Sequence, residues 1–286
     1  MENRTNTPLH LAMYNKNYKI LKTLQKMLCD ETLLILCHRD SEERKSIKEA
    51  LHYHLTATNG EGLTFMTIAT KMSKSDVNDA TVISVLDKFY ELYKNEEYLK
   101  YSLVSNSDKY DNTILHHAVI ANREELADYL STKPVDVNRK NANGFCAFHL
   151  AAMHTTPCFM RKFVKSFKHR IDINCRTGEN ETALHLVTKA CNVKMIATLV
   201  ELGGNLASQD LDGHTPLHDV IQKLNLEEDD KKEQLVQFRN IWHEIVRVSP
   251  IWWCQLLGKD LADMDSELYR HYQQDAMMFL RSEIYN

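Results

Sequence analysis

The chain has 286 residues and a formal net charge of −4 at pH 7, with 26% charged and 43% hydrophobic residues. This composition is typical of a soluble globular protein, and the absence of a Lys/Arg excess argues against a nucleic-acid partner. Seven scattered cysteines form no C-x-x-C pair. That spacing argues against a disulfide framework or a zinc site and indicates free thiols in a reducing compartment.

The sequence contains no apolar run of the length that a membrane span requires. The first recognisable motif begins at Thr7, which leaves no room for a signal peptide before it. We therefore expect a cytoplasmic protein, or a nuclear one, with no direct membrane insertion in this segment.

A hexapeptide recurs six times along the chain. Its cleanest copy is Thr7-Pro8-Leu9-His10-Leu11-Ala12, and the copies start at Thr7, Thr64, Thr113, Cys146, Thr182 and Thr215. The starts are separated by 57, 49, 33, 36 and 33 residues. A period near 33 residues with this motif indicates a solenoid of stacked helix pairs.

Each motif position has a predicted mechanical role. The Thr is expected to cap a helix by accepting a hydrogen bond from the first turn, and Pro is tolerated directly after it. We expect the His to join neighbouring repeats through its ring nitrogens. Cys146 is a poor cap, and Phe65 and Thr67 replace Pro and His in the second copy. The second repeat should therefore be the least regular.

A turn pattern precedes the four later copies, with Asp five residues and Gly two residues before the motif. Asp210 and Gly213 fit this pattern, whereas Asp111 and Asn180 stand at the Gly position of their repeats. Asp and Asn are the non-glycine residues that best tolerate a positive φ, which this turn requires.

The hexapeptide and this turn together resemble the ankyrin repeat family over residues 1 to about 224. The resemblance implies an all-α solenoid of six helix-turn-helix repeats joined by β-hairpin loops. It also implies non-catalytic binding of a protein or peptide partner on the concave face and the loop tips.

Two segments lengthen the first half of the solenoid. Insertions near 29–59 and 86–107 account for the wide spacing of the first three copies, and both are predicted to be helical. Gly203 is predicted to end the second helix of the fifth repeat. Residues 1–224 would form the repeat domain. Residues 225–286, which contain all three tryptophans (Trp242, Trp252 and Trp253), would form a helical cap or a docking extension.

No arrangement of residues points to catalysis or metal binding. Five of the fourteen histidines occupy the motif position, and the close pairs His116-His117 and His52-x-His54 suit no single metal. No nucleophile elbow, phosphate-binding loop or dinucleotide fingerprint is present. We predict no enzyme activity, no metal site and no cofactor.

The remaining surface is predicted to recognise a partner. Repeat geometry, as the family resemblance implies it, places the loop tips just before each motif and the inner groove seven and eight residues after its start. Exposed apolar and aromatic side chains on a rigid scaffold are typical of binding hot spots. The predicted partner-binding residues are Tyr110, Asn112, Asn143, Phe145, Met153, His154, Glu179, Glu181, Lys189, Leu211 and His214, and Lys71 and Ile120 also line the groove.

One narrower similarity concerns Asn138. Leu130 followed at a distance by Asp136-Val137-Asn138 is similar to the substrate pattern of the asparaginyl hydroxylase that modifies ankyrin proteins. The resemblance implies a modification site at Asn138.

Two other functions stay open at this point. The chain could be the cytosolic ankyrin domain of a larger membrane channel, or the targeting module of an enzyme whose catalytic domain lies elsewhere. The sequence names neither the partner nor the oligomeric state, because one scaffold serves many functions.

Overall fold

The computed structural model describes residues 6–28, 49, 52–93 and 97–216. The chain divides into two compact units, Met1–Ile171 and Asp172–Asn286, which are described separately. Numbered by the copies of the hexapeptide, repeats 1 to 4 belong to the first unit. Repeat 5 and the start of repeat 6 belong to the second.

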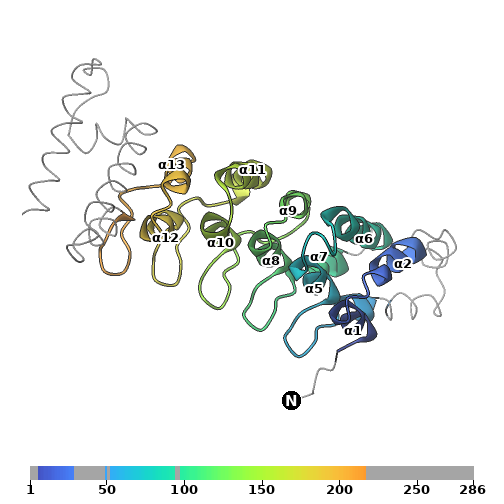
Figure 1. Ribbon diagram of the computed structural model, residues 1–286. Helices are drawn as coiled ribbons and strands as arrows, with labels where there is room; N and C mark the ends of the chain where they lie inside the picture. The colour runs from blue at the N-terminus through green and yellow to red at the C-terminus, as the bar shows by residue number, and fades with distance from the viewer. Residues whose placement is uncertain (1–5, 29–48, 50–51, 94–96, 217–286) are drawn as a thin grey trace, which may run out of the picture. The chain divides into compact units, whose positions relative to one another are not determined.

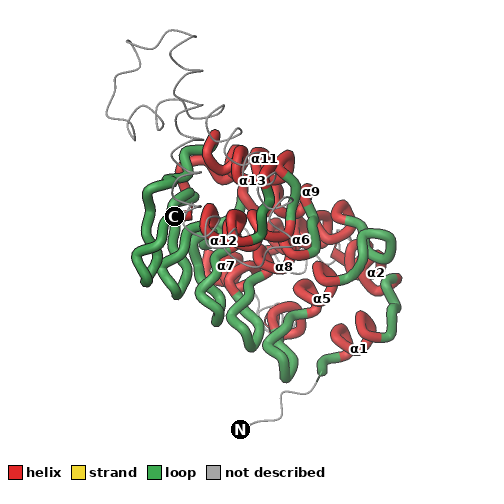
Figure 2. The backbone as a smooth tube through the Cα atoms, turned by 60° about the vertical axis from the view of Figure 1, so that its left-hand side comes forward, coloured by secondary structure: helices red, strands yellow, loops and turns green. Residues whose placement is uncertain are grey.

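The first unit consists of two layers of helices (Figure 1). The inner layer contains α1 (Pro8–Tyr14), α5 (Phe65–Lys71), α8 (Ile114–Ile120) and α10 (Ala147–His154). The outer layer contains α2 (Lys19–Leu28), α6 (Asp79–Leu92), α9 (Glu124–Ser131) and α11 (Pro157–Phe167), and the short 3₁₀ helix η1 (Lys168–Arg170) follows α11. The loops that precede the inner helices all project on one side, as Figure 2 shows.

The second unit contributes one described helix pair, α12 (Ala183–Lys189) and α13 (Val193–Glu201). Gly203, at φ +100°, follows α13, and Gly204 N–H donates to the Leu199 carbonyl at 2.8 Å. This is the left-handed helix end predicted for Gly203. Apart from one isolated bridge between Ser107 and Thr113, the described residues form helices and loops without a strand.

The motif histidines join neighbouring repeats, as the sequence predicted. Nε2 of His10 lies 2.8 Å from the Leu63 carbonyl oxygen, and that of His116 lies 3.2 Å from the Phe145 carbonyl oxygen. Within the second unit His185 makes the same bond to the His214 carbonyl at 3.1 Å. Because a carbonyl only accepts, each Nε2 donates, and burial lowers the pKa of His10 and His116 so that both rings favour this neutral form.

The capping threonines differ from the expectation in one respect. The hydroxyl of Thr64 accepts the backbone N–H of Thr67, as predicted. In the repeats that keep the motif His, the hydroxyl also lies against the ring, with Thr7 Oγ1 2.6 Å from His10 Nδ1. The first residue of the motif therefore also orients the ring that joins the repeats.

The same type of turn recurs at five loop tips, each of which lies just before a motif. The residue at its start accepts two backbone N–H groups through its side chain: Asp108 Oδ1, for example, accepts from Tyr110 and Asn112, each at 2.9 Å. The predicted positive φ is present at Asp111 (59°) and Asn180 (62°). The five tips span residues 59–63, 108–112, 141–145, 177–181 and 210–214.

Repeat 2 also carries this turn, which the sequence reasoning overlooked. Asn59 stands five residues and Gly62 two residues before Thr64, and Gly62 has φ 76°. A Cβ on Gly62 would come within 2.9 Å of the Asp108 backbone. The tips of repeats 2 and 3 therefore approach so closely that only glycine fits at this position.

Repeat 2 departs from the others, as expected, because Thr67 replaces the motif His. The Thr67 hydroxyl donates to Thr64 O at 2.7 Å, within its own repeat. Repeat 2 also carries the longest described helix, α6, with 14 residues, and the additional helix α7 (Glu97–Ser105) after it. These two helices occupy most of the predicted insertion at 86–107.

A buried arginine joins repeats 2 and 3. Arg123 has no exposed surface, and its guanidinium donates to the carbonyls of Ala69, Thr70, Met72 and Val77 at 2.7–3.1 Å. It also forms an ion pair at 2.8 Å with the Asp79 carboxylate, which is itself buried. The residue that begins the outer helix of repeat 3 thus binds both the end of α5 and the start of α6.

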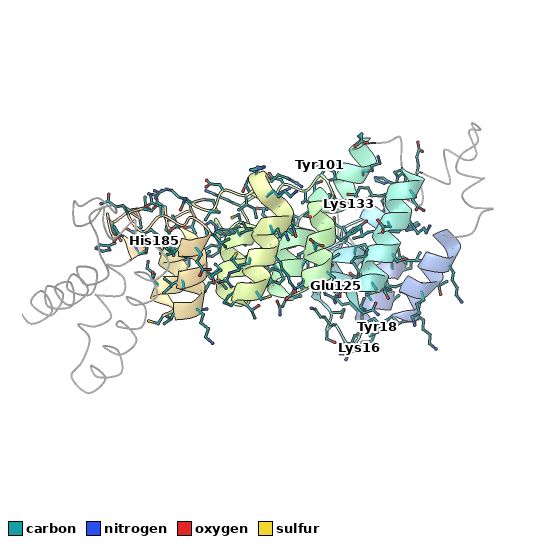
Figure 3. All side chains as sticks on the ribbon, turned by 90° about the horizontal axis from the view of Figure 1, so that it is seen from above. Lys16, Tyr18, Tyr101, Glu125, Lys133 and His185 are labelled. Atoms are coloured by element: carbon teal, nitrogen blue, oxygen red, sulfur yellow. The ribbon has the colours of Figure 1, made fainter. Side chains whose placement is uncertain are left out.

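The outer layer of the first unit is held by aromatic and ionic contacts. Lys133, labelled in Figure 3, lies over the rings of Tyr90 (4.4 Å) and Tyr129 (4.3 Å). The Tyr129 hydroxyl donates to Asp87 Oδ1 at 2.6 Å. Helices α6 and α9 are therefore tied on the side away from the tips.

Several predictions fall on residues outside the described part of the chain. Most of the insertion at 29–59 and all of the segment 225–286, with Trp242, Trp252 and Trp253, lie there. Both stay predictions. None of the helices in the described part of the chain is long and apolar enough to cross a membrane.

Candidate protein-recognition face

The inner helices of the first unit expose a row of side chains at one repeat position. This position lies seven residues after the start of each motif, and its occupants are Tyr14, Lys71, Ile120 and Met153. Tyr14 is 45% and Ile120 47% exposed; Lys71 is also exposed, and Met153 is half-buried. Together with α1 and the three tips of the first unit at 59–63, 108–112 and 141–145, these side chains form the surface that we call the recognition face.

Two apolar residues of this face were missing from the predicted set. Leu11 is 48% exposed, and the hydroxyl of the exposed Tyr14 accepts a hydrogen bond from Asn59 Nδ2 at 2.9 Å. Tyr14 occupies the same repeat position as Ile120, so the motif spacing from Thr7 could have found it. The Asn59 contact holds the phenol in place on the surface.

The tips of the first unit are bound to one another through the backbone. Lys109 N–H donates to the Glu61 carbonyl, and Ala142 N–H donates to the Tyr110 carbonyl, both at 2.8 Å. Tyr110 is 57% exposed, and Lys109 Nζ lies 5.1 Å from the centre of its ring. This exposed aromatic side chain thus stands on a tip that is fixed on both sides, and Asn143 is exposed on the next tip.

Other predicted residues are engaged within the protein. Asn112 is half-buried, and its side chain bridges Asp108 Oδ2 (3.2 Å) and Asn141 Nδ2 (2.8 Å). Phe145 is half-buried with its ring 6.2 Å from that of His149. His154 is exposed at the end of α10. Asn112 and Phe145 therefore shape the tips more than they offer surface.

The second unit presents its own predicted residues. Leu211 is 72% exposed and Glu179 is exposed, whereas His214 is half-buried and its carbonyl accepts from His185. Glu181 requires a correction, because only 7% of it is exposed. Its carboxylate binds Lys189 Nζ, since a carboxylate at this depth needs a cationic partner. Glu181 is thus withdrawn from the surface, whereas the paired Lys189 side chain remains 42% exposed.

A buried, hydrogen-bonded pair of side chains lies beneath the recognition face at repeat 3. His117 Nε2 is 3.0 Å from Asp108 Oδ2, and each side chain is at most 6% exposed. Desolvation lowers the pKa of His117 to about 4, against the opposing attraction of Asp108. His117 is therefore neutral at pH 7 and donates to Asp108, the residue that organises the tip of repeat 3.

Asn138 lies on the exposed connection after α9. Its Nδ2 donates to the Arg170 carbonyl at 2.8 Å, and its backbone N–H donates to Asp136 Oδ1 at 3.1 Å. A modification at this side chain would act on the contact with the segment after α11. Hydroxylation of Asn138 stays a prediction.

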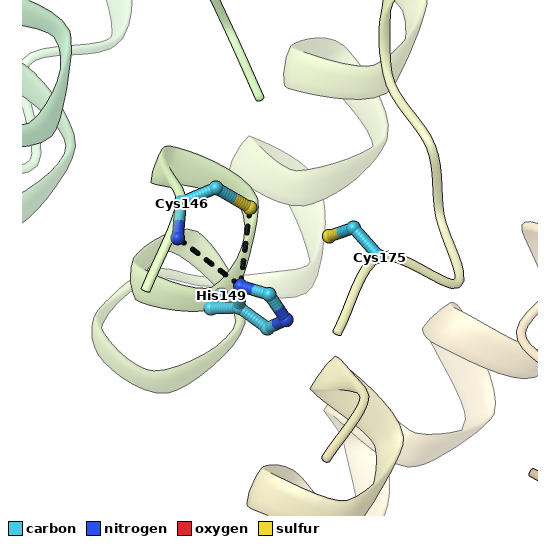
Figure 4. Close-up of side chains that lie close together, drawn as sticks. All are labelled: Cys146, His149 and Cys175. Carbon is cyan, nitrogen blue, oxygen red and sulfur yellow. Dashed lines mark hydrogen bonds between the residues drawn. The ribbon is translucent and has the colours of Figure 1, made fainter. Parts of the chain in front are cut away.

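Groups with metal-binding side chains serve structural roles instead. Cys146 Sγ lies 3.1 Å from His149 Nδ1, and Cys146 N–H donates to the same nitrogen (Figure 4, which also draws Cys175 of the second unit). Cys146 thus takes the place that Thr holds in other motifs. Asp210, Asp212 and His214 are close together, but Asp210 Oδ1 already accepts the backbone N–H groups of its tip.

The comparisons with known proteins agree with this geometry. Models of ankyrin repeats match residues 148–228 and 115–157. The ankyrin repeat protein FPV223 of fowlpox virus (strain NVSL) is 29% identical over 120 residues, which is 40% of this chain and 77% of that protein. The crystal structure of the ankyrin repeat protein EF0377 matches with a TM-score of 0.51 and 18% identity, over 74% of this chain and 96% of that one.

Other relatives are much longer than the region they share with this chain. The nuclear factor NF-kappa-B p105 subunit of Gallus gallus is 27% identical over 151 residues, half of this chain but 15% of that protein. Human inversin is 30% identical over 119 residues, 41% of this chain and 11% of inversin. The motif, the tips and these matches together show that the chain belongs to the ankyrin repeat family. Ankyrin repeats are in general protein–protein interaction modules and typically non-catalytic.

Proposed function

We propose that this protein binds a protein or peptide partner on its recognition face and performs no catalysis. The observation that carries the proposal is the row of side chains at one repeat position of the inner helices, in which the apolar Tyr14 and Ile120 are each close to half exposed. Apolar groups that a folded protein leaves in water in one row are typical of an interaction site.

The scaffold beneath this row is rigid, which favours binding. Backbone hydrogen bonds join the tips, and ring hydrogen bonds from His10 and His116 join the repeats. A surface that is already ordered loses little conformational entropy on association. Tyr110, with 57% of its surface exposed on a fixed tip, is the residue we expect to contribute most.

The second unit offers contact candidates of its own. Its tips carry Leu211, Glu179 and His214. Leu211 is 72% exposed, more than any other large apolar side chain in the described part of the chain. We include these three as contact candidates of the second unit by itself.

The test uses affinity capture with the full chain, followed by titration of the captured partner against purified variants. Tyr110→Ala and Ile120→Asp should each weaken binding by about 1 kcal/mol or more if these side chains are hot spots. Tyr101→Ala is the matched control, because Tyr101 is a tyrosine on α7 that is 46% exposed outside the recognition face. Equal affinities for all three variants and the wild type would remove the recognition face as the binding site.

A further inference from the structure

The inner helices of the first unit contain no carboxylate. None of α1, α5, α8 and α10 includes Asp or Glu. Among the outer helices, α2 and α11 also lack a carboxylate, whereas α6 carries Asp79, Asp87 and Glu91 and α9 carries Glu124, Glu125 and Asp128. In a chain with a net charge of −4, the inner helices of the first unit thus add no negative charge to the recognition face.

The acidic groups on the neighbouring tips are already paired. Lys109 Nζ lies 3.6 Å from the Glu61 carboxylate, and Arg139 lies 3.8 Å from that of Asp111. Asp108 is buried and accepts from His117 and from its own tip. Cations at the tips therefore balance the charges of Glu61 and Asp111, and the carboxylate of Asp108 is withdrawn from the surface.

Lys71 is the cation that stands within the row of exposed inner-helix side chains. It ends α5 and is exposed, and no ion pair to it is formed within the described part of the chain. His117, the basic group near it, is neutral at pH 7. Lys71 thus offers one unbalanced positive charge between the apolar side chains of Tyr14 and Ile120.

The spacing of the row suits an extended peptide. Tyr14, Lys71, Ile120 and Met153 occupy one position in four successive repeats. Packed helices lie about 8–10 Å apart, and an extended chain rises about 3.3 Å per residue. A peptide that crosses the inner helices therefore advances by about three residues for each repeat.

We propose that the recognition face binds an extended peptide segment in which a carboxylate pairs with Lys71 and apolar side chains at about three-residue intervals contact Tyr14, Ile120 and Met153. This inference rests on the proposed function and specifies the partner. The apolar contacts supply most of the affinity, because they remove exposed hydrocarbon from water. The carboxylate supplies specificity, because an opposite charge is favoured at Lys71 and a like charge is repelled.

The experiment selects binding sequences from a library of random peptides of about 12 residues, which is long enough to cross four repeats in extended form. The full chain is immobilised as the wild type and as the variants Lys71→Glu and Lys74→Glu. Lys74 is the matched control, because it is an exposed lysine in the loop after α5. Melting curves of the three proteins establish that each is folded.

The wild type and Lys74→Glu should enrich peptides with Asp or Glu flanked by apolar residues at the stated interval. Lys71→Glu should lose the acidic preference and enrich Lys or Arg there. For a selected peptide, Lys71→Gln should weaken binding by about tenfold. This is the loss of affinity expected when a hydrogen bond to a charged group is removed. An unchanged preference in Lys71→Glu, a selection without an acidic position, or no enrichment at all would overturn the proposal.

The two proposals fail in different ways. If Ile120→Asp abolishes binding of a captured protein while Lys71→Glu does not alter it, the recognition face stands and the acidic peptide is wrong. If neither variant alters that binding, the recognition face itself is wrong.

Discussion

The interface between repeats 2 and 3 and the interface between repeats 3 and 4 serve the same structural purpose with different chemistry. Between repeats 3 and 4 the motif residue His116 donates to the Phe145 carbonyl, and exposed pairs such as Lys162 with Glu124 add to it. Between repeats 2 and 3 the motif His is absent, because Thr67 stands in its place. Arg123 instead binds four carbonyls and the Asp79 carboxylate in a fully buried position.

This difference shows that hydrogen bonding between repeats matters more than the residue that provides it. The missing bond from the inner helix is replaced by a residue at the start of the outer helix of the next repeat. The replacement tolerates substitution poorly, because removing either the guanidinium or the carboxylate leaves the other buried without its partner.

Removing Arg123 should have the largest effect on stability. In Arg123→Met the buried Asp79 carboxylate and several carbonyls lose their partner, so we expect a loss of about 3–5 kcal/mol in the free energy of unfolding. Lys162→Met removes the exposed ion pair at the next interface, where the loss should be below about 1 kcal/mol. Urea unfolding of both variants measures the contrast, and equal losses would show that Arg123 does not carry the interface.

Acid should destabilise repeat 3 more than repeat 4. Repeat 3 has His117 and Asp108 where repeat 4 has Leu150 and Asn141. The pKa of His117 is about 4 in the folded protein against 6.5 when unfolded. Below pH 6.5 only the unfolded state therefore takes up this proton, and stability falls until about pH 4, in total by about 3 kcal/mol. Above pH 7 this group adds no pH dependence.

The double variant His117→Leu, Asp108→Asn gives repeat 3 the pair found in repeat 4. Its unfolding free energy should fall less steeply between pH 6.5 and 4 than that of the wild type, as measured by urea unfolding at several pH values. Part of the slope should persist, because burial also lowers the pKa of His10 and His116. An identical slope in both proteins would contradict the assignment to His117.

The smallest expected change in stability concerns the tips of repeats 3 and 4. Asp111 has φ 59° at the position where the next tip has Gly144. Asp111→Gly should relieve this strain and stabilise the protein by about 0.5–1 kcal/mol, although the contact with Arg139 is lost. Asn143→Gly is the control, since Asn143 is not among the positive-φ residues and a glycine there should destabilise slightly. Thermal melting distinguishes the two, and a lower melting temperature for Asp111→Gly would contradict the strain.

The sequence predicted the features that depend on neighbours along the chain. The turn at Asp111 and Asn180, the helix end at Gly203 and the bonds of the motif histidines all follow from short patterns with one physical solution. Arg123 could not be predicted in this way, because its partners lie 44–54 residues earlier and it stands beside two glutamates, like a solvated charge. The burial of Glu181 likewise depends on Lys189 reaching back from α12.

The candidate surface was predicted in part. Exposure at Tyr110 and Ile120 follows from repeat position alone. Asn112 and Phe145 occupy tip positions of the same kind, yet they turn toward neighbouring residues, which position in the repeat does not specify. The repeat pattern therefore predicts the backbone conformation of the tips but not the orientation of their side chains.

The buried guanidinium also has a consequence for how the protein folds. In a solenoid, stability is approximately a sum of repeat terms and nearest-neighbour interface terms, and folding can begin at one interface and propagate to its neighbours. Arg123 finds its acceptors only when the end of α5 and the start of α6 are both formed. Repeats 2 and 3 should therefore open and close as one cooperative unit, from which order spreads toward repeat 4.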